Sequence, residues 1–280
     1  MTSKRKALSE LTITDDFMFG QVMSDPKIAR ETIQRILGDQ IGPITRVTPQ
    51  QTVVNEKNNH GVRFDVLAKS EDTGKVYEVE MQTSYQKDLA KRTRYYHWAI
   101  DANILPAGAR YSELRPCYII FICTFDPFAK GKTLYSFEMK SDDTPPLSLE
   151  DGTHTVFLNV DGNCDTISQE LKCLVNYFRS GVVSDEFTKS MDNAVCSIKQ
   201  SSEKEAEYEL TMNRLDEIRE KGREEGREEG REEFALDIIH SLAAISLPNE
   251  SIVDVLAGTK GFDRDKASKL VATELEKIDL

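Results

Sequence analysis

Long apolar runs are missing from this sequence of 280 residues. A helix that crosses a membrane needs roughly 20 predominantly apolar residues, and no stretch of the chain approaches that length. The basic start, residues 1–6, has no apolar segment behind it, so we do not expect it to act as a secretion signal. These absences predict a cytoplasmic protein that has no membrane partner.

Cysteine and histidine are also scarce, with five and four residues. The number of cysteines is odd, and no two of them have the spacing of zinc ligands. The histidines are scattered along the chain. We therefore expect reduced thiols, and we expect neither a disulfide framework nor a metal site built from histidine or cysteine.

Positive charge is in deficit, because the formal net charge is -12. Such a balance argues against nucleic acid as a partner, but its distribution weakens the objection. Residues 203–233 contain 13 acidic and 7 basic residues, which is half of the excess. Residues 82–96 are locally basic, with Lys87, Lys91, Arg92 and Arg94 against Asp88. Charge alone leaves DNA binding open.

What the sequence does contain is a hairpin that carries acidic residues. Residues 63–68 and 77–82 read as strands, and residues 71–75 have the composition of the turn between them. Because side chains alternate along a strand, Glu78, Glu80 and Gln82 share one face, and pairing brings Asp65 near Glu80 and Gln82. Oxygen ligands of this kind suit Mg²⁺, with water completing its coordination.

These residues resemble a known family. Asp65, a hairpin, Glu80-x-Gln82 and then a helix with Lys91-Arg92-x-x-Tyr95-Tyr96 are similar to the PD-(D/E)xK nuclease superfamily. The resemblance is closest to Rpn-type recombination-promoting nucleases, a branch also described as transposases. It extends over most of the chain, including residues 14–19, residues 115–122 and the Gly-Arg-Glu-Glu repeats. Gln82 departs from the usual Lys, and Gly20 stands where relatives often carry a basic residue.

The resemblance implies an α/β fold with a restriction-endonuclease-like core, in which helices flank a central mixed β-sheet, and a helical C-terminal tail. It implies a DNA endonuclease in which Asp65 and Glu80 hold Mg²⁺ or Mn²⁺. In that interpretation, Gln82 orients the nucleophilic water or the scissile phosphate. Because a Gln offers only hydrogen bonds where a Lys adds a charge, activity is expected to be modest or to depend on an assembled partner.

Other residues near this motif allow two interpretations each. Glu78 is either a third metal ligand or, as we favour, a solvated carboxylate at the edge of the sheet. Asp16 is either an additional acid of the site or, as we favour, a helix cap. Lys91, Arg92 and Tyr95 either contact phosphates and bases of DNA or form a basic, solvated helix face.

The pattern of apolar residues predicts the remaining elements. Two helices are expected within residues 15–37, separated at Asp25-Pro26, and another over residues 85–105. Strands are expected at residues 117–124, 134–140 and 154–160, and helices at 165–179 and 185–199. A strand that returns to the same sheet after a helix indicates a parallel crossover, and hence a mixed sheet.

Composition divides the chain into three expected regions. Residues 1–200 form the nuclease-like domain, residues 201–233 a charged repeat helix or linker, and residues 234–280 a small helical module. Glycine at every fourth position costs about 1 kcal/mol each in a helix, more than the Glu–Arg pairs return. We therefore expect a fraying spacer, or one stabilised by a partner chain.

Two interpretations remain open for the last module, and two for the function. Residues 234–280 are interpreted either as a DNA contact of the helix-turn-helix kind or as a module for homo-oligomerisation or docking. For the whole protein, the alternative to a nuclease is a DNA-binding or assembly module that retains the fold without turnover. The acidic balance, Gln82 and the repeats motivate this second interpretation.

Overall fold

The computed structural model describes residues 5–53 and 62–278. The polar composition of residues 55–61 predicts a loop, and these residues lie outside the described ones. Contacts divide the chain into two units, the first ending at Ala206 and the second beginning at Glu207. This division differs from the three expected regions, whose boundaries remain a prediction.

The first unit is built on one mixed sheet of six strands, in the order β1-β2-β3-β4-β6-β5. The neighbours β1–β2, β2–β3 and β5–β6 are antiparallel, whereas β3–β4 and β4–β6 are parallel. The expected mixed sheet with a parallel crossover is therefore confirmed. The strands are β1 (Ile44–Val53), β2 (Val62–Ser70), β3 (Val76–Gln82), β4 (Cys117–Cys123), β5 (Leu134–Phe137) and β6 (Thr153–Asn159).

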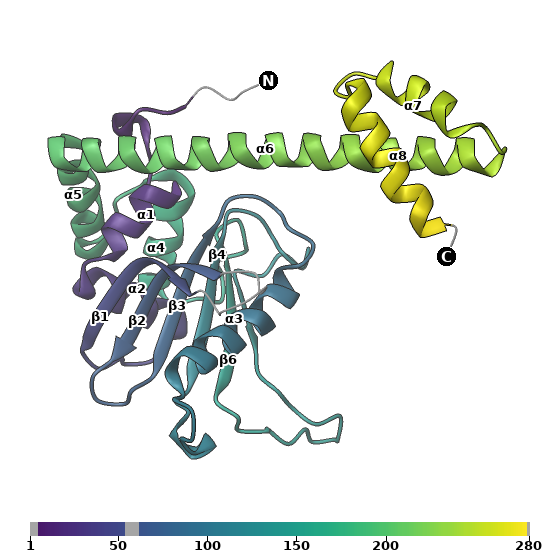
Figure 1. The fold of residues 1–280 in the computed structure, drawn as a ribbon. Helices are drawn as coiled ribbons and strands as arrows, with labels where there is room; N and C mark the ends of the chain where they lie inside the picture. The colour runs from purple at the N-terminus through teal and green to yellow at the C-terminus, as the bar shows by residue number, and fades with distance from the viewer. Residues whose placement is uncertain (1–4, 54–61, 279–280) are drawn as a thin grey trace. The chain divides into compact units, whose positions relative to one another are not determined.

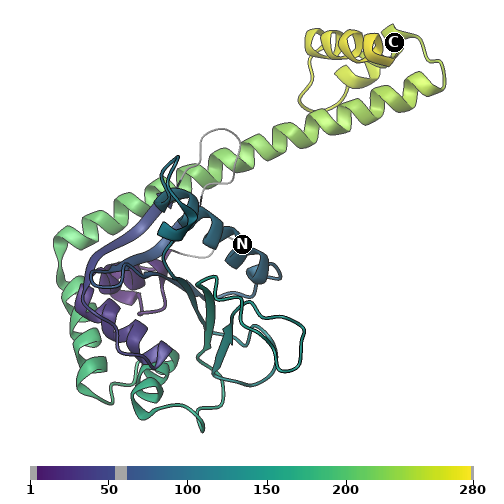
Figure 2. The same ribbon diagram turned by 90° about the horizontal axis from the view of Figure 1, so that it is seen from below.

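Helices cover both faces of this sheet. Figures 1 and 2 show α3 along one face, while α1, α2, α4 and α5 gather on the other side. The α-helices of this layer are α1 (Asp16–Met23), α2 (Pro26–Leu37), α3 (Leu89–Ile104), α4 (Gln169–Ser180) and α5 (Glu186–Gln200). Two short 3-10 helices, η1 (Leu8–Glu10) and η2 (Tyr111–Glu113), complete the unit.

Local signals in the sequence account for several helix ends. Asp25 accepts a hydrogen bond from the backbone N–H of Lys27, and Pro26 follows as the first helical residue of α2. Gly38 ends α2 with a φ of 74°, a conformation that glycine adopts without strain. By contrast, α3 begins at Leu89 and not at the expected residue 85, so helical spacing of apolar residues placed its start four residues too early.

The core of the unit is centred on β4, which is flanked by β3 and β6. Ile119 and Phe121 belong to the apolar cluster that includes Tyr96, Ala99 and Ile100 of α3. Because side chains alternate, their neighbours along β4 point to the opposite helix layer. A strand buried on both faces matches the continuous apolar pattern of residues 117–123.

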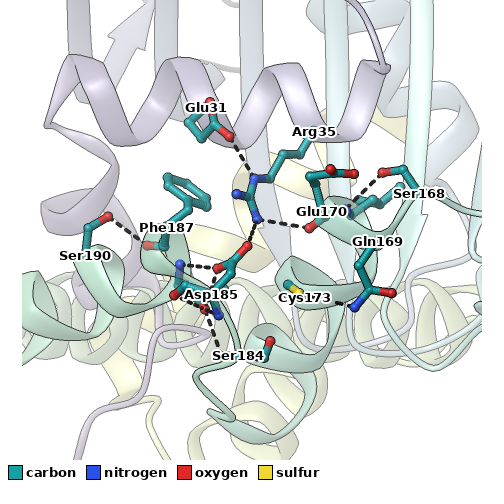
Figure 3. Close-up of polar contacts among 12 residues, drawn as sticks. Glu31, Arg35, Ser168, Gln169, Glu170, Cys173, Ser184, Asp185, Phe187 and Ser190 are labelled. Carbon is teal, nitrogen blue, oxygen red and sulfur yellow. Dashed lines mark hydrogen bonds and ion pairs between the residues drawn. The ribbon is translucent and has the colours of Figure 1, made fainter.

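An arginine joins three helices in the layer opposite α3 (Figure 3). Arg35 of α2 forms ion pairs with Glu31 at 2.8 Å and with Asp185, the N-cap of α5, at 2.5 Å. It also donates to the carbonyl oxygen of Glu170 at the start of α4, at 3.0 Å, and its guanidinium lies 4.4 Å from the ring centre of Phe187. Its side chain is only 9% exposed. Arg35 therefore links α2, α4 and α5 through one buried cation.

The second unit is helical. It contains most of α6 (Ser202–Ala244), followed by α7 (Asn249–Ala257) and α8 (Arg264–Ile278). An apolar cluster packs these helices together, with Ala235, Ile239, Ile252 and Leu256 among its buried members. Within the described residues, no helix is long and apolar enough to span a membrane.

The Gly-Arg-Glu-Glu repeats lie inside α6, so of the two expected forms, a repeat helix or a linker, the structure has the helix. A Cβ at Gly222, Gly226 or Gly230 would meet nothing within 4 Å, which means that no close packing demands these glycines. The physical reason for the helix lies beyond the repeats. Ala235 and Ile239, on the same helix, are fully buried against α7 and α8, and tertiary packing outweighs weak local propensity.

Candidate functional site

The strand β3 lies in the interior of the sheet, between β2 and β4. Its in-register partners are Ile119 for Glu78 and Phe121 for Glu80, so these acids share the sheet face that α3 covers. Glu78 is fully buried, and Glu80 and Gln82 are 5% and 8% exposed. The expectation that Glu78 is a solvated carboxylate at the sheet edge is therefore wrong, because the returning strand β4 covers that edge.

Asp65 reaches the same site from β2. The pairing of β2 with β3 runs from Lys69–Val76 to Val66–Val79 and stops one residue before Asp65. There the Asp65 carboxylate accepts a hydrogen bond of 3.1 Å from the backbone N–H of Met81. A side chain thus takes the place of a backbone acceptor exactly where the two strands separate, and it fixes Asp65 beside the Glu80 strand.

Burial and neighbouring charge change the proton affinity of Asp65. Burial, followed by the charge of Glu80, raises the pKa of Asp65 to about 7. The pKa of Glu78 is also raised, first by burial and then by the charge of Glu80. Carboxyl groups that crowd together away from water favour protonation, unless a cation offsets their charge.

Arg92 of α3 supplies one such cation. Its guanidinium pairs with Glu80 Oε1 at 2.5 Å and donates to Gln82 Oε1 at 3.2 Å and Gln86 Oε1 at 2.7 Å. The Arg92 side chain is 22% exposed. Neither expectation for this residue, a DNA contact or a solvated basic face, anticipated that it contacts the acids of the site.

Tyr96, one turn further along α3, is a site residue that the sequence analysis did not single out. Its hydroxyl accepts a hydrogen bond from Arg92 at 2.6 Å and donates one to Glu80 Oε1 at 3.2 Å. From the sequence, Tyr96 is the last residue of the helix motif that carries the resemblance, and its ring belongs to the core. The spacing of four residues between Arg92 and Tyr96 is the signal that places both on one helix face.

Asp16 lies within electrostatic range of this group. Burial, opposed by the charge of Arg63, raises the pKa of Asp16, and its charge in turn contributes to the raised pKa of Asp65. Asp15 and not Asp16 occupies the N-cap position of α1. The helix-cap interpretation of Asp16 is therefore wrong in its position, while a role as an additional acid of the site stays a prediction.

The remaining DNA-contact candidates lie on the outer part of α3. Lys91 is exposed, and Tyr95 is half-buried with its ring 5.1 Å from that of Trp98. Trp98 is 43% exposed. Successive residues of a helix are rotated by about 100°. Lys91 and Tyr95 therefore lie on the face of α3 next to the one that carries Arg92.

The donor set suits a divalent cation. In the described part of the chain, no group of three or more His, Cys, Asp or Glu side chains is arranged to hold a metal ion. Mg²⁺ nevertheless needs only one or two carboxylates, because it retains several waters. Glu80 Oε2 and the two carboxylate oxygens of Glu78 are buried and receive no N–H or O–H from another residue, and the Glu78 carboxyl can hydrogen-bond to Glu80 only when it is protonated. Buried oxygens without donors are costly unless a cation or a proton satisfies them.

The mixed sheet with its parallel crossover through α3 agrees with the fold that the resemblance implies. The chain matches the family described as PD-(D/E)XK nuclease family transposase over residues 15–244, and it belongs to that family. The resemblance inferred from the sequence is thereby confirmed. Searches of curated proteins and of solved structures find no match.

Proposed function

We propose that this protein is a metal-dependent DNA endonuclease that hydrolyses phosphodiester bonds, with Asp65 and Glu80 as the ligands of Mg²⁺ or Mn²⁺. The observation that supports it most strongly is the placement of Asp65, which accepts a hydrogen bond from the N–H of Met81, the residue after Glu80, and whose pKa the Glu80 charge helps to raise. Membership of a nuclease family makes DNA the natural substrate class.

A bound divalent ion supplies charge neutralisation at the phosphate and lowers the pKa of water. The protein contributes position and dielectric environment. Asp65 is held by the Met81 N–H, and Glu80 by Arg92 and Tyr96, so both carboxylates are oriented before substrate arrives. Their burial strengthens the attraction for a cation, because few water molecules screen it.

Gln82 has a narrower role than the Lys that is usual at this position. Its Nε2 donates to Glu80 Oε1 and to the Met81 carbonyl, both at 3.3 Å, and its Oε1 accepts from Arg92. An amide cannot accept a proton from water at neutral pH. In the proposed mechanism, Gln82 therefore orients the water or the phosphate, and it does not serve as the general base.

Lys91 and Tyr95 are the proposed DNA contacts on α3, and replacement of Lys91 tests this surface. We expect Lys91→Ala to weaken duplex DNA binding about threefold to tenfold and to reduce the slope of log K against log salt by about 1, as the loss of one phosphate contact does. Fluorescence anisotropy at several salt concentrations in EDTA measures both. Lys189→Ala, at an exposed position of α5, is the matched control. Equal effects of the two substitutions would remove Lys91 from the interface.

A plasmid-nicking assay tests the function itself. Wild type, Asp65→Ala and Glu80→Ala are compared in Mg²⁺, Mn²⁺, Ca²⁺ and EDTA. The proposal predicts cutting by wild type in Mg²⁺ or Mn²⁺, and loss of cutting in both variants and in EDTA. Equal cutting by all three proteins would indicate a contaminant or another site.

The same assay separates the alternative function. Absence of cutting by wild type in every metal, together with retained DNA binding, would contradict the endonuclease and favour a DNA-binding or assembly module. Gln82, which stands where the family usually has Lys, is the observation that supports this alternative.

A further inference from the structure

The two oxygens of the Glu80 carboxylate have opposite surroundings. Oε1 receives three donors, namely Arg92 Nη2 at 2.5 Å, Tyr96 Oη at 3.2 Å and Gln82 Nε2 at 3.3 Å. Oε2 is buried and receives none of these donors, and the neighbouring Glu78 carboxyl can hydrogen-bond to the Glu80 carboxylate only when Glu78 is protonated. A carboxylate in water distributes its hydrogen bonds over both oxygens, so this asymmetry is imposed by the groups packed around it.

The donors on Oε1 are themselves held in place. The Tyr96 ring packs edge-on against Phe64, with centroids 5.2 Å apart, and stacks on Phe121 at 6.1 Å. The Arg92 guanidinium lies 5.2 Å from the Tyr96 ring centre and 5.6 Å from that of Phe121. Arg92 Nη1 donates a hydrogen bond of 2.7 Å to Gln86 Oε1. Aromatic packing thus fixes where both donors meet Glu80.

We propose that Arg92 and Tyr96 are positioning residues, which hold Glu80 through Oε1 and keep Oε2 directed to the divalent ion. This inference rests on the proposed function, because it concerns the same metal site. It assigns to Arg92 a task other than the contact with DNA expected from the sequence. Groups that hydrogen-bond to metal ligands commonly change metal affinity by about 10- to 100-fold when they are replaced.

A competing arrangement makes the opposite prediction. If the Arg92 guanidinium instead occupied the position of the ion, the metal would have to displace it from Glu80. A substitution that weakens the contact between Arg92 and Glu80 would then tighten metal binding. The separate surroundings of Oε1 and Oε2 favour positioning, since an ion can take the place of a Glu78 proton at Oε2 while Arg92 remains on Oε1. The sign of the change in metal affinity distinguishes the two arrangements.

Two substitutions that conserve charge provide the test. Tyr96→Phe removes one donor to Oε1 but keeps the ring against Phe64 and Phe121. Arg92→Lys keeps the positive charge but loses the planar fork that reaches several acceptors at once. Tyr111→Phe, at a tyrosine that is 84% exposed, is the matched control.

Equilibrium binding of Mn²⁺ to the full chain, without DNA, is measured by isothermal titration calorimetry. We expect Tyr96→Phe to raise the Mn²⁺ dissociation constant about tenfold and Arg92→Lys about 10- to 100-fold, while Tyr111→Phe leaves it unchanged. Trp98 fluorescence during unfolding verifies that each variant is folded before titration, since this residue is the only tryptophan.

Wild type and Asp65→Ala separate this inference from the proposed function. If wild type binds Mn²⁺ and Asp65→Ala does not, unchanged or tighter binding by Tyr96→Phe and Arg92→Lys overturns the positioning role and leaves the metal site intact. If wild type does not bind Mn²⁺, or Asp65→Ala binds it equally, the metal site itself fails and the positioning role fails with it.

Discussion

Asp65→Asn is expected to abolish metal-dependent cleavage and, in the absence of metal, to stabilise the folded protein above neutral pH. The loss of activity should reach about a thousandfold, because a metal centre supplies several kcal/mol to the transition state and each 1.4 kcal/mol is a factor of ten. The gain in stability has a different origin, which is the cost of an ionised Asp65 in a buried, acidic group.

The direction of the pH dependence follows from the raised pKa of Asp65, which is about 7 in the folded protein against 3.8 for the free side chain. Between these values, the folded state binds more protons than the unfolded state. The contribution of Asp65 to stability is therefore fully present below pH 3.8 and is lost as pH rises to about 7, at up to about 1.4 kcal/mol per pH unit. Asparagine does not titrate, so its variant avoids this loss.

Unfolding in urea at pH 5 and pH 8, with EDTA present, measures this prediction through Trp98 fluorescence. Trp98 belongs to α3, so it reports on the unit that contains the site. Asp65→Asn should gain more stability over wild type at pH 8 than at pH 5, whereas Asp142→Asn, at an exposed position, should gain none. An Asp65→Asn protein that is less stable than wild type at pH 8 would show that the carboxylate is needed for folding.

Arg35→Ala is expected to reduce the free energy of unfolding by about 2–3 kcal/mol, below most of the range for a buried ion pair, because the partners Asp185 and Glu31 are 25% and 36% exposed. The substitution leaves Asp185 and Glu31 without their cation and the Glu170 carbonyl without its donor. It also removes the guanidinium that packs on the Phe187 ring. Four contacts among three helices are lost together, which is why the effect exceeds that of a surface pair.

Urea unfolding followed by Trp98 fluorescence measures this loss as well. Lys140→Ala is the control, because Lys140 pairs with Glu138 at 2.6 Å while both side chains are well exposed, at 47% and 39%. Exposed pairs contribute about 0–1 kcal/mol. Similar losses for Arg35→Ala and Lys140→Ala would mean that Arg35 does not join the helices energetically.

The order of elements around the site could be predicted from the sequence. Alternation of apolar and polar residues located the hairpin, and Asp25-Pro26 and Gly38 located the ends of α2, because these signals act between near neighbours. The mixed sheet followed from a strand that returns after a helix. Local patterns therefore sufficed to bring Asp65 and Glu80 to adjacent strands.

The environment of the site could not be predicted in the same way. The sequence predicts a solvated Glu78 because the residues of its own strand do not indicate that β4 pairs with the edge of β3. Arg92 read as exposed because a basic residue on a helix is usually so, and its partners Glu80 and Gln82 lie 12 and 10 residues away in the sequence. Burial and pairing of charges depend on contacts that only the folded chain creates.

We propose that Asp65 and Glu80 together bind the ion with which this protein cuts DNA. A crystal soaked in Mn²⁺, with the ion located by its anomalous scattering, shows directly whether they do. We expect one or two ions between β2 and β3, with Asp65 and Glu80 Oε2 among the ligands and Arg92 still on Oε1. An ion bound elsewhere on the protein, or a site between β2 and β3 that stays without Mn²⁺, would contradict it.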